Sequence, residues 1–197
     1  MKGAGLPFEG FSEEESQGIE IIVSDVDDTI TNSGKLLPEA LAALWEAKRA
    51  GKMIVLVTGG SAGWADAYIR QWPVDLVIAE GGALALAHGK DDSIVYKFNP
   101  HIAPDAKKKR ENLLKATAGL TLSSDQYARV HDIAYDKSKL SSYELKTLLS
   151  VVQAMGGHAS VSSIHVNVGF GKFSKASSYI MFMSTLFDMQ YPSVVTK

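Results

Sequence analysis

Short apolar runs alternate with amphipathic stretches along the first half of the chain. Apolar runs bounded by turn residues are typical of strands buried in a parallel sheet, whereas apolar positions that recur every three or four residues are typical of helices. Strands separated by helices indicate an α/β fold in which helices cover both faces of a parallel sheet. The pattern predicts strands at residues 19–24, 53–57 and 76–79, and helices at residues 37–50 and 62–70.

The pattern changes after residue 82. A predicted β-hairpin is followed by a mixture of helices and short strands, which indicates a small α+β lobe inserted into the α/β core. Ser174 is the expected N-cap of a last helix that packs Ile180 and Met183 against the core. We expect a core of residues 1–98 and 169–197, with residues 1–18 flexible, and a lobe of residues 99–168. The hairpin is predicted at residues 83–87 and 94–98, lobe helices at 105–117 and 141–155, and lobe strands at 127–134, 158–161 and 164–168.

Composition excludes several classes of function. The chain has 197 residues, 46% of them hydrophobic, and a formal net charge of -2, so it has no basic field for binding nucleic acid. The cationic run Lys107 to Arg110 falls in an expected helix, where a solvated face explains it. The absence of cysteine excludes disulfides and thiolate ligands. Because no apolar stretch reaches membrane-spanning length and no hydrophobic signal core is found, we expect a cytoplasmic protein with no membrane partner.

Three carboxylates follow the first predicted strand directly. Asp25, Asp27 and Asp28 lie at its carboxyl end, and the next strand runs into Thr58, Gly59 and Gly60. In an α/β fold these two strand ends meet at the edge of the sheet where ligands bind. Close carboxylates repel one another, and their desolvation also opposes ionisation, so a crevice of this kind favours a divalent cation.

Other interpretations of the acidic cluster explain less of the sequence. A calcium-binding loop needs Gly at the sixth position and Glu at the twelfth, where this chain has Ile30 and Leu36. A phospho-acceptor domain of the receiver type needs an Asp at the end of the third strand, where this chain has Glu80 and two glycines. If the acidic cluster is only a solvated turn, the presence of Thr58 and two glycines at the end of the neighbouring strand has no explanation.

Phosphoryl transfer through an aspartate nucleophile uses all of these residues. The two-residue spacing of Asp25 and Asp27 directs both side chains the same way, so that one attacks phosphorus while the other exchanges protons. The hydroxyl of Thr58 and the backbone N–H groups of Gly59 and Gly60 are suited to holding phosphoryl oxygens.

The run Asp25-Val-Asp27-Asp28-Thr29, followed by Val57-Thr58-Gly59, resembles the first two motifs of the haloacid dehalogenase superfamily. The resemblance covers most of the chain, and the inserted lobe is similar to the type C2 (IIB) cap of Cof-like and sucrose-phosphatase-like members. It implies a Rossmann-like core with an α+β cap. It also implies Asp25 as nucleophile, Asp27 as general acid and base, and Thr58 as a phosphoryl ligand.

The resemblance further implies a lysine at the start of the helix that follows the lobe. Lys175, directly after Ser174, fits best, because the ammonium and the positive end of the helix would act on one anion, and Lys172 is the alternative. Mg2+ would be bound at Asp25 and Asp27. His165 and Asn167, on the strand returning to the core, are candidate substrate contacts, whereas His131 and His158 are interpreted as ordinary packed or surface histidines.

The fourth motif of the superfamily, an acidic cluster of the GDxxxD kind, has no counterpart after Asp188. From the resemblance we therefore expect a core that ends before this motif, weak metal binding, and an uncovered strand edge at Val194 and Val195 that favours a homodimer. The function predicted from the motifs is a Mg2+-dependent phosphatase of small phosphorylated metabolites, such as sugar phosphates or phosphoglycolate, that forms an aspartyl-phosphate. Two alternatives stay open: a metal- or phosphate-binding protein without turnover, and a phosphomutase or phosphotransferase.

Overall fold

The computed structural model describes residues 12, 14, 17–89, 91 and 93–187. Most of the tail predicted to be flexible, the segment after Asp188 and the strand edge predicted at Val194 and Val195 lie outside these residues.

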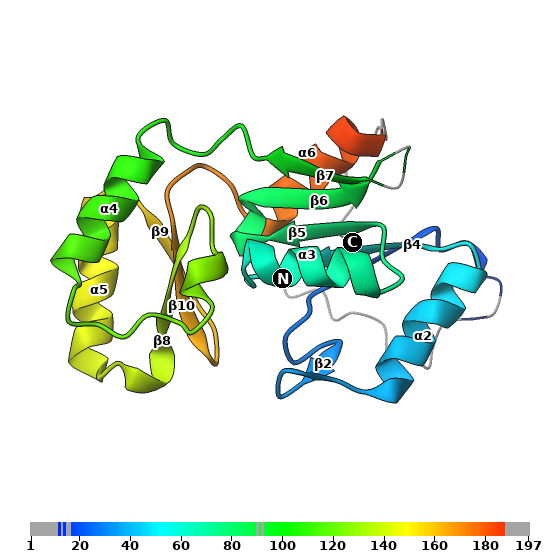
Figure 1. The fold of residues 1–197 in the computed structure, drawn as a ribbon, viewed down its shortest axis with the longest axis horizontal. Helices are drawn as coiled ribbons and strands as arrows, with labels where there is room; N and C mark the ends of the chain where they lie inside the picture. Colours follow the sequence, from blue (N-terminus) through cyan, green and yellow to red (C-terminus); the bar gives the residue numbers. More distant parts are fainter. Residues whose placement is uncertain (1–11, 13, 15–16, 90, 92, 188–197) are drawn as a thin grey trace.

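The core is built on a five-stranded sheet (Figure 1). Its first three strands run parallel, with Ser24 paired to Leu56 and Leu56 paired to Val77, and the last two strands are antiparallel. This arrangement confirms the α/β fold with a mainly parallel sheet. The strand order is β1 (Ile21–Ser24), β4 (Met53–Val57), β5 (Leu76–Ala79), β6 (Leu84–His88) and β7 (Ile94–Phe98).

Helices cover both faces of this sheet because its strands are apolar on both sides. Along β4, Ile54 and Leu56 belong to one buried cluster, while Val55 and Val57 belong to the cluster on the opposite face. The alternation of side chains along a strand produces this division. Helices α2 (Pro38–Arg49) and α3 (Ala62–Gln71) pack on the first face, and α6 (Lys175–Phe187) packs on the second.

The lobe has a sheet and an apolar core of its own (Figure 1). Its three strands are antiparallel, and side chains such as Leu113, Leu148 and Val166 are fully or almost fully buried between the sheet and two helices. A capping box between Ser141 and Glu144 begins the second helix. The elements are α4 (Ala106–Ala116), α5 (Ser142–Ala154), and the strands β8 (Ile133–Asp136), β10 (His165–Gly169) and β9 (His158–Val161), in that spatial order.

The described part of the chain also contains short elements that were not predicted. A two-stranded hairpin follows the acidic cluster, and three 3-10 turns lie at junctions between elements. The hairpin consists of β2 (Thr31–Asn32) and β3 (Lys35–Leu36), and the turns are η2 (Glu80–Gly82), η3 (Gln126–Ala128) and η4 (Lys137–Lys139).

Three predictions of local structure are wrong. Residues 127–134 do not form one strand, because they begin in η3, the backbone at 130–132 donates hydrogen bonds to the Glu80 side chain of the core, and β8 starts only at Ile133. β1 lies at the edge of the sheet that the described residues form, and Val23 is 45% exposed instead of buried. Ile180 lies on the outer side of α6 and is also largely exposed.

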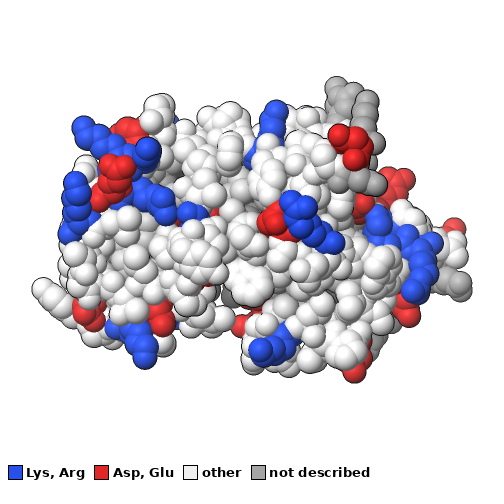
Figure 2. All heavy atoms as spheres, viewed as in Figure 1, with Lys and Arg blue, Asp and Glu red and all other residues white. Residues whose placement is uncertain are grey.

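Charged side chains of both signs are interspersed over the face drawn in Figure 2. The basic side chains gather most densely at the upper left, where Figure 1 places α4 with its run Lys107 to Arg110. Among the described residues, none of the helices combines the length and the hydrophobicity needed to cross a bilayer.

We expect the Gly82→Ala substitution to destabilise the protein by about 2–4 kcal/mol. Gly82 has φ +113, and a Cβ there would lie 2.9 Å from Cβ of the buried Ser178 on α6. The substitution therefore combines backbone strain with an overlap that moves α6. The measurement is urea denaturation, with Gly119→Ala as the control, because a Cβ at Gly119 meets no atom within 4 Å. Equal stability of the two variants would contradict the expectation.

Candidate active site

In the turn after β1, Asp25 and Asp27 flank the buried residue Val26. Val26 is fully buried, and its carbonyl oxygen accepts hydrogen bonds from the N–H groups of Thr29, Ile30 and Thr31 at 3.0–3.3 Å. Because this turn is wrapped around Val26, Asp25 and Asp27 both remain exposed at the carboxyl end of the strand.

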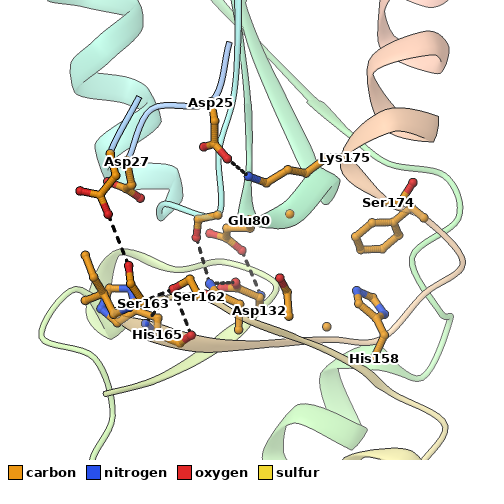
Figure 3. Close-up of a pocket in the computed structure, with 18 residues that line it drawn as sticks. Asp25, Asp27, Glu80, Asp132, His158, Ser162, Ser163, His165, Ser174 and Lys175 are labelled. Atoms are coloured by element: carbon orange, nitrogen blue, oxygen red, sulfur yellow. Dashed lines mark hydrogen bonds and ion pairs between the residues drawn. The ribbon is translucent and has the colours of Figure 1, made fainter. Parts of the chain in front are cut away.

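Lys175 contacts Asp25 from the far end of the chain. Its Nζ donates to Oδ2 of Asp25 at 2.5 Å, across 150 residues of sequence (Figure 3). The other oxygen of Asp25, Oδ1, accepts the N–H of Val26 at 2.7 Å. Ser174 caps the helix that carries Lys175, since its Oγ accepts the N–H of Ser177 at 3.2 Å, as predicted. Both charged side chains are more than two-fifths exposed, so this ion pair orients groups and adds little stability.

The surroundings of Asp27 shift its pKa. Partial burial, followed by the negative charge of Asp25, raises the pKa of Asp27 above its ordinary value, and the nearby His165 opposes this shift. A carboxyl group that keeps its proton more readily than usual is suited to protonating a leaving oxygen.

The loop after β4 lies beside these carboxylates. Thr58 is only 1% exposed, and its Oγ1 accepts the N–H of Gly60 at 2.9 Å. Gly59 lines the same cavity as Asp25, whereas Gly60 lines a neighbouring cavity that it shares with Asp27. Within the described part of the chain, the N–H of Gly59 donates to no acceptor, so it is free to bind a ligand oxygen.

A cavity of about 320 Å³ lies between the core and the lobe (Figure 3). The core contributes mainly carboxylates and glycines to its wall, the lobe sheet contributes small polar side chains and imidazoles, and the start of α6 closes one side. The lining residues are Asp25, Asp27, Asp28, Gly59, Glu80, Gly81, Asp132, His158, Ser160, Ser162, Ser163, Ile164, His165, Asn167, Gly169, Phe173, Ser174 and Lys175.

The lobe wall follows the pleat of its sheet. On β10, His165 and Asn167 line the cavity, while the alternating Val166 and Val168 are fully buried in the lobe core. The same alternation on β9 brings His158 and Ser160 to the cavity. His158 packs edge-on against Phe173, with 5.2 Å between ring centroids, and burial lowers its pKa, which favours a neutral imidazole.

A cluster of buried polar groups joins the lobe to the core, and we call Glu80, Arg129, Asp132, Asn167 and the carbonyl of Gly59 the junction cluster. Glu80 is 2% exposed and accepts three lobe N–H groups, those of residues 130–132, at 2.7–3.0 Å. Arg129 and Asn167 each donate to the carbonyl oxygen of Gly59 and to the Asp132 carboxylate.

Most of the residues predicted for the site are brought together. Asp25, Asp27, Gly59 and Lys175 line one cavity with His165 and Asn167, whereas Thr58 is buried behind the wall and Gly60 faces the neighbouring cavity. Lys172 is exposed and does not line the cavity. The residues that sequence reasoning missed include His158, Ser160, Ser162, Glu80, Arg129 and Asp132. A period-two pattern of polar side chains at residues 158–162 could have indicated the first three.

Several carboxylates line this cavity. Five carboxylates, those of Asp25, Asp27, Asp28, Glu80 and Asp132, line it against the single ammonium of Lys175. Carboxylate oxygens are the ligands that Mg2+ prefers, so this part of the wall fits Mg2+. No group of three or more Asp, Glu or His side chains is arranged to hold an ion within the described residues, so this part of the chain supplies few direct ligands.

Comparison with protein families gives a match over more than half of the chain. The model for haloacid dehalogenase-like hydrolases matches residues 22–155, a range that starts in β1 and includes Asp25, Asp27 and Thr58. The chain belongs to this family. This membership confirms the resemblance found in the sequence, and it makes the protein a hydrolase of the haloacid dehalogenase type.

Solved structures show the same fold for this haloacid dehalogenase-like hydrolase. A Thermoplasma acidophilum protein is 16% identical, with a TM-score of 0.69, over 88% of this chain and 73% of its own. A superfamily phosphatase of Bacteroides thetaiotaomicron is 18% identical (TM-score 0.57, 92% and 77% covered). The sucrose-phosphatase of Synechocystis is 17% identical (TM-score 0.57, 86% and 71% covered). A search of curated proteins by sequence found no match.

We expect Asp132 to make the stability of this hydrolase depend on pH. Burial raises the pKa of Asp132 to about 7 from 3.8, against the opposing charge of Arg129. The folded protein then retains a proton that the unfolded chain releases, so its free energy of unfolding falls as pH rises from about 4 to about 7.

Urea denaturation of wild type and Asp132→Asn across this pH range measures the effect. The free energy of unfolding of the wild type, relative to that of Asp132→Asn, should decrease as pH rises over this range. The total decrease is about 1.4 kcal/mol for each unit by which the pKa of Asp132 differs between the folded and the unfolded protein. An advantage that is constant over the range would contradict the raised pKa.

Proposed function

We propose that this hydrolase is a phosphatase of small phosphoric monoesters that works through an aspartyl-phosphate on Asp25. The observation that carries the proposal is the contact of Lys175 with Asp25 inside a cavity that Asp27 and the free N–H of Gly59 also line. Phosphoryl transfer needs a carboxylate nucleophile, a proton donor and positive groups on the phosphoryl oxygens, and these residues have those properties.

In the first step, a carboxylate oxygen of Asp25 forms a bond to phosphorus while the bond from phosphorus to the ester oxygen breaks. Asp27 gives its proton to that departing oxygen, and its raised pKa favours the protonated form that this role needs. Lys175 stabilises negative charge on the phosphoryl oxygens. In the second step, Asp27 takes a proton from water as the water oxygen attacks phosphorus, and inorganic phosphate and the Asp25 carboxylate are released.

Mg2+ is the cofactor proposed for this site. The Asp25 carboxylate and the backbone carbonyl of Asp27 would hold it, with water and substrate oxygens as further ligands. When bound, the ion would neutralise charge on the phosphoryl group.

The proposed substrates are small phosphorylated metabolites with polar leaving groups, such as sugar phosphates or phosphoglycolate. The cavity, at about 320 Å³, lies at the lower end of the range for small-molecule sites. The hydroxyls of Ser160 and Ser162 and the imidazoles of His158 and His165 on its lobe wall favour hydroxylated or carboxylated compounds. Neighbours described as a subclass IIB sugar phosphatase and a sucrose-phosphatase support the same class of substrate.

A second candidate is a phosphate-binding protein with little turnover. The small number of direct metal ligands among the described residues favours it. Phosphate binding measured by calorimetry, without release of product from any ester, would select this function over hydrolysis.

Hydrolysis of an aryl phosphate in the presence of Mg2+ tests the nucleophile. We expect Asp25→Asn to lower kcat by at least about 1,000-fold, because the amide cannot form the phospho-enzyme. Asp66→Asn is the control, since Asp66 pairs with Arg70 on α3 and does not line the cavity. Wild-type activity in the Asp25 variant would refute the proposed mechanism, and transfer of phosphate to an added sugar would identify a phosphotransferase.

Removal of divalent metal tests the cofactor. We expect EDTA to abolish hydrolysis and added Mg2+ to restore it, with half-saturation on the order of 1 mM because the described residues provide few ligands. Full activity in the presence of EDTA would exclude the metal from the reaction.

A further inference from the structure

The carbonyl of Gly59 is held by two side chains of the lobe. Nη1 of Arg129 donates to this oxygen at 3.0 Å, and Nδ2 of Asn167 donates to it at 2.9 Å. The lobe therefore fixes the orientation of the Gly59–Gly60 peptide from outside the loop. On the other side of that peptide, the N–H of Gly60 donates to Oγ1 of Thr58.

Arg129 is positioned by a complete set of partners. Its side chain has no exposed surface, and besides Gly59 it donates to both oxygens of Asp125 and both oxygens of Asp132 at 2.9–3.2 Å. A guanidinium held by two carboxylates in this way has one orientation available to it. Because it is fully buried, Arg129 cannot contact a substrate directly.

Glu80 of the core holds the backbone segment that directly follows Arg129. Its carboxylate accepts the N–H groups of the three residues that follow Arg129 and the N–H of Ala62 at the start of α3. Its own N–H donates to the carbonyl of Gly60. Glu80 also has φ 50, an unfavourable conformation for a residue with a side chain, and strain of this kind persists where surrounding contacts impose it.

We propose that Arg129 and Asn167 are positioning residues that hold the loop Thr58–Gly60 in the conformation that binds the transferred phosphoryl group, an inference that rests on the proposed function. Two donors, one of them charged, fix the Gly59 carbonyl and with it the peptide that follows. The free N–H of Gly59 belongs to the preceding peptide, Thr58–Gly59, whose Thr58 carbonyl accepts the N–H of Gly81 at 3.2 Å. With both peptides of Gly59 held, this N–H at the cavity wall keeps its direction toward the place of the phosphoryl oxygens. The lobe thus acts on phosphoryl transfer itself as well as on the choice of leaving group.

A positioning role makes a particular kinetic prediction. A misdirected N–H donor weakens stabilisation of the transition state for every ester, because the transferred phosphoryl group is common to all of them. The loss in kcat is then the same for a small alkyl phosphate and for a bulky aryl phosphate. If Asn167 instead contacted the leaving group, the loss would differ between the two esters.

The experiment compares Arg129→Lys and Asn167→Leu with wild type. The lysine preserves the charge balance of the junction cluster but cannot reach Asp125, Asp132 and Gly59 together, and the leucine removes the amide donor at nearly the same size. We expect each variant to lower kcat about tenfold or more, by equal factors for glycerol phosphate and p-nitrophenyl phosphate, with a smaller change in KM. Hydrogen exchange of the Gly60 amide, which donates to Oγ1 of Thr58, should become faster in both variants in the ligand-free protein.

Two controls separate positioning from general effects. Ser160→Ala changes the same cavity wall without a contact to Gly59, and Lys48→Met breaks the ion pair with Asp75 away from the cavity. Neither should alter amide exchange at Gly60, and a loss of stability in Lys48→Met should leave kcat unchanged.

Each outcome decides the inference. Unchanged amide exchange at Gly60 in folded Arg129→Lys and Asn167→Leu, or unequal losses for the two esters, overturns it. If the wild-type protein hydrolyses neither ester, the proposed function fails, and amide exchange alone then decides whether the lobe holds this loop.

Discussion

The structure of the site depends on the repulsion between carboxylates gathered at the end of β1. Asp25, Asp27 and Asp28 occupy one short turn, and the fold places them at the edge of the sheet where a ligand can approach. Lys175, from the helix that follows the lobe, supplies the one ammonium that lines the cavity in the described structure. The residues between Asp25 and Lys175 include the whole lobe, so this contact joins two core segments that the lobe separates in sequence.

Polar contacts, more than apolar ones, determine how the lobe meets the core. The core and the lobe have separate apolar clusters, and between them lies the junction cluster, in which buried charges and backbone groups satisfy one another. Hydrogen bonds and buried ion pairs specify direction, whereas apolar burial alone permits sliding. The directional bonds of the junction cluster therefore fix how the lobe is oriented on the core beside the cavity.

Sequence alone predicted the parts of the fold that depend on local pattern. The apolar runs of β4 and β5 and the turn after β1 are continuous in sequence, so periodicity and motif spacing sufficed to predict them, and the family match confirms the resemblance to the superfamily. The strand predicted at residues 127–134 was wrong because its backbone bonds to Glu80, a contact between residues some fifty positions apart. Glu80 and Arg129 were missed for the same reason: charged side chains in ordinary turns give no local sign that they are buried. The exposure of β1 likewise depends on which strand lies at the edge of the sheet.

In the lobe sheet, the side chains that line the cavity and the side chains that pack the lobe interior lie on opposite faces. On β9 and β10, residues pointing to the cavity alternate with residues pointing to the lobe interior, so His158, Ser160 and His165 can be exchanged without opening a void among Val166, Val168 and their neighbours. Selection for a new leaving group can therefore act on one face of this sheet at little cost in folding. The lobe sheet therefore allows side chains at the cavity to change while the packing beneath them and the proposed phosphoryl chemistry of the core are preserved.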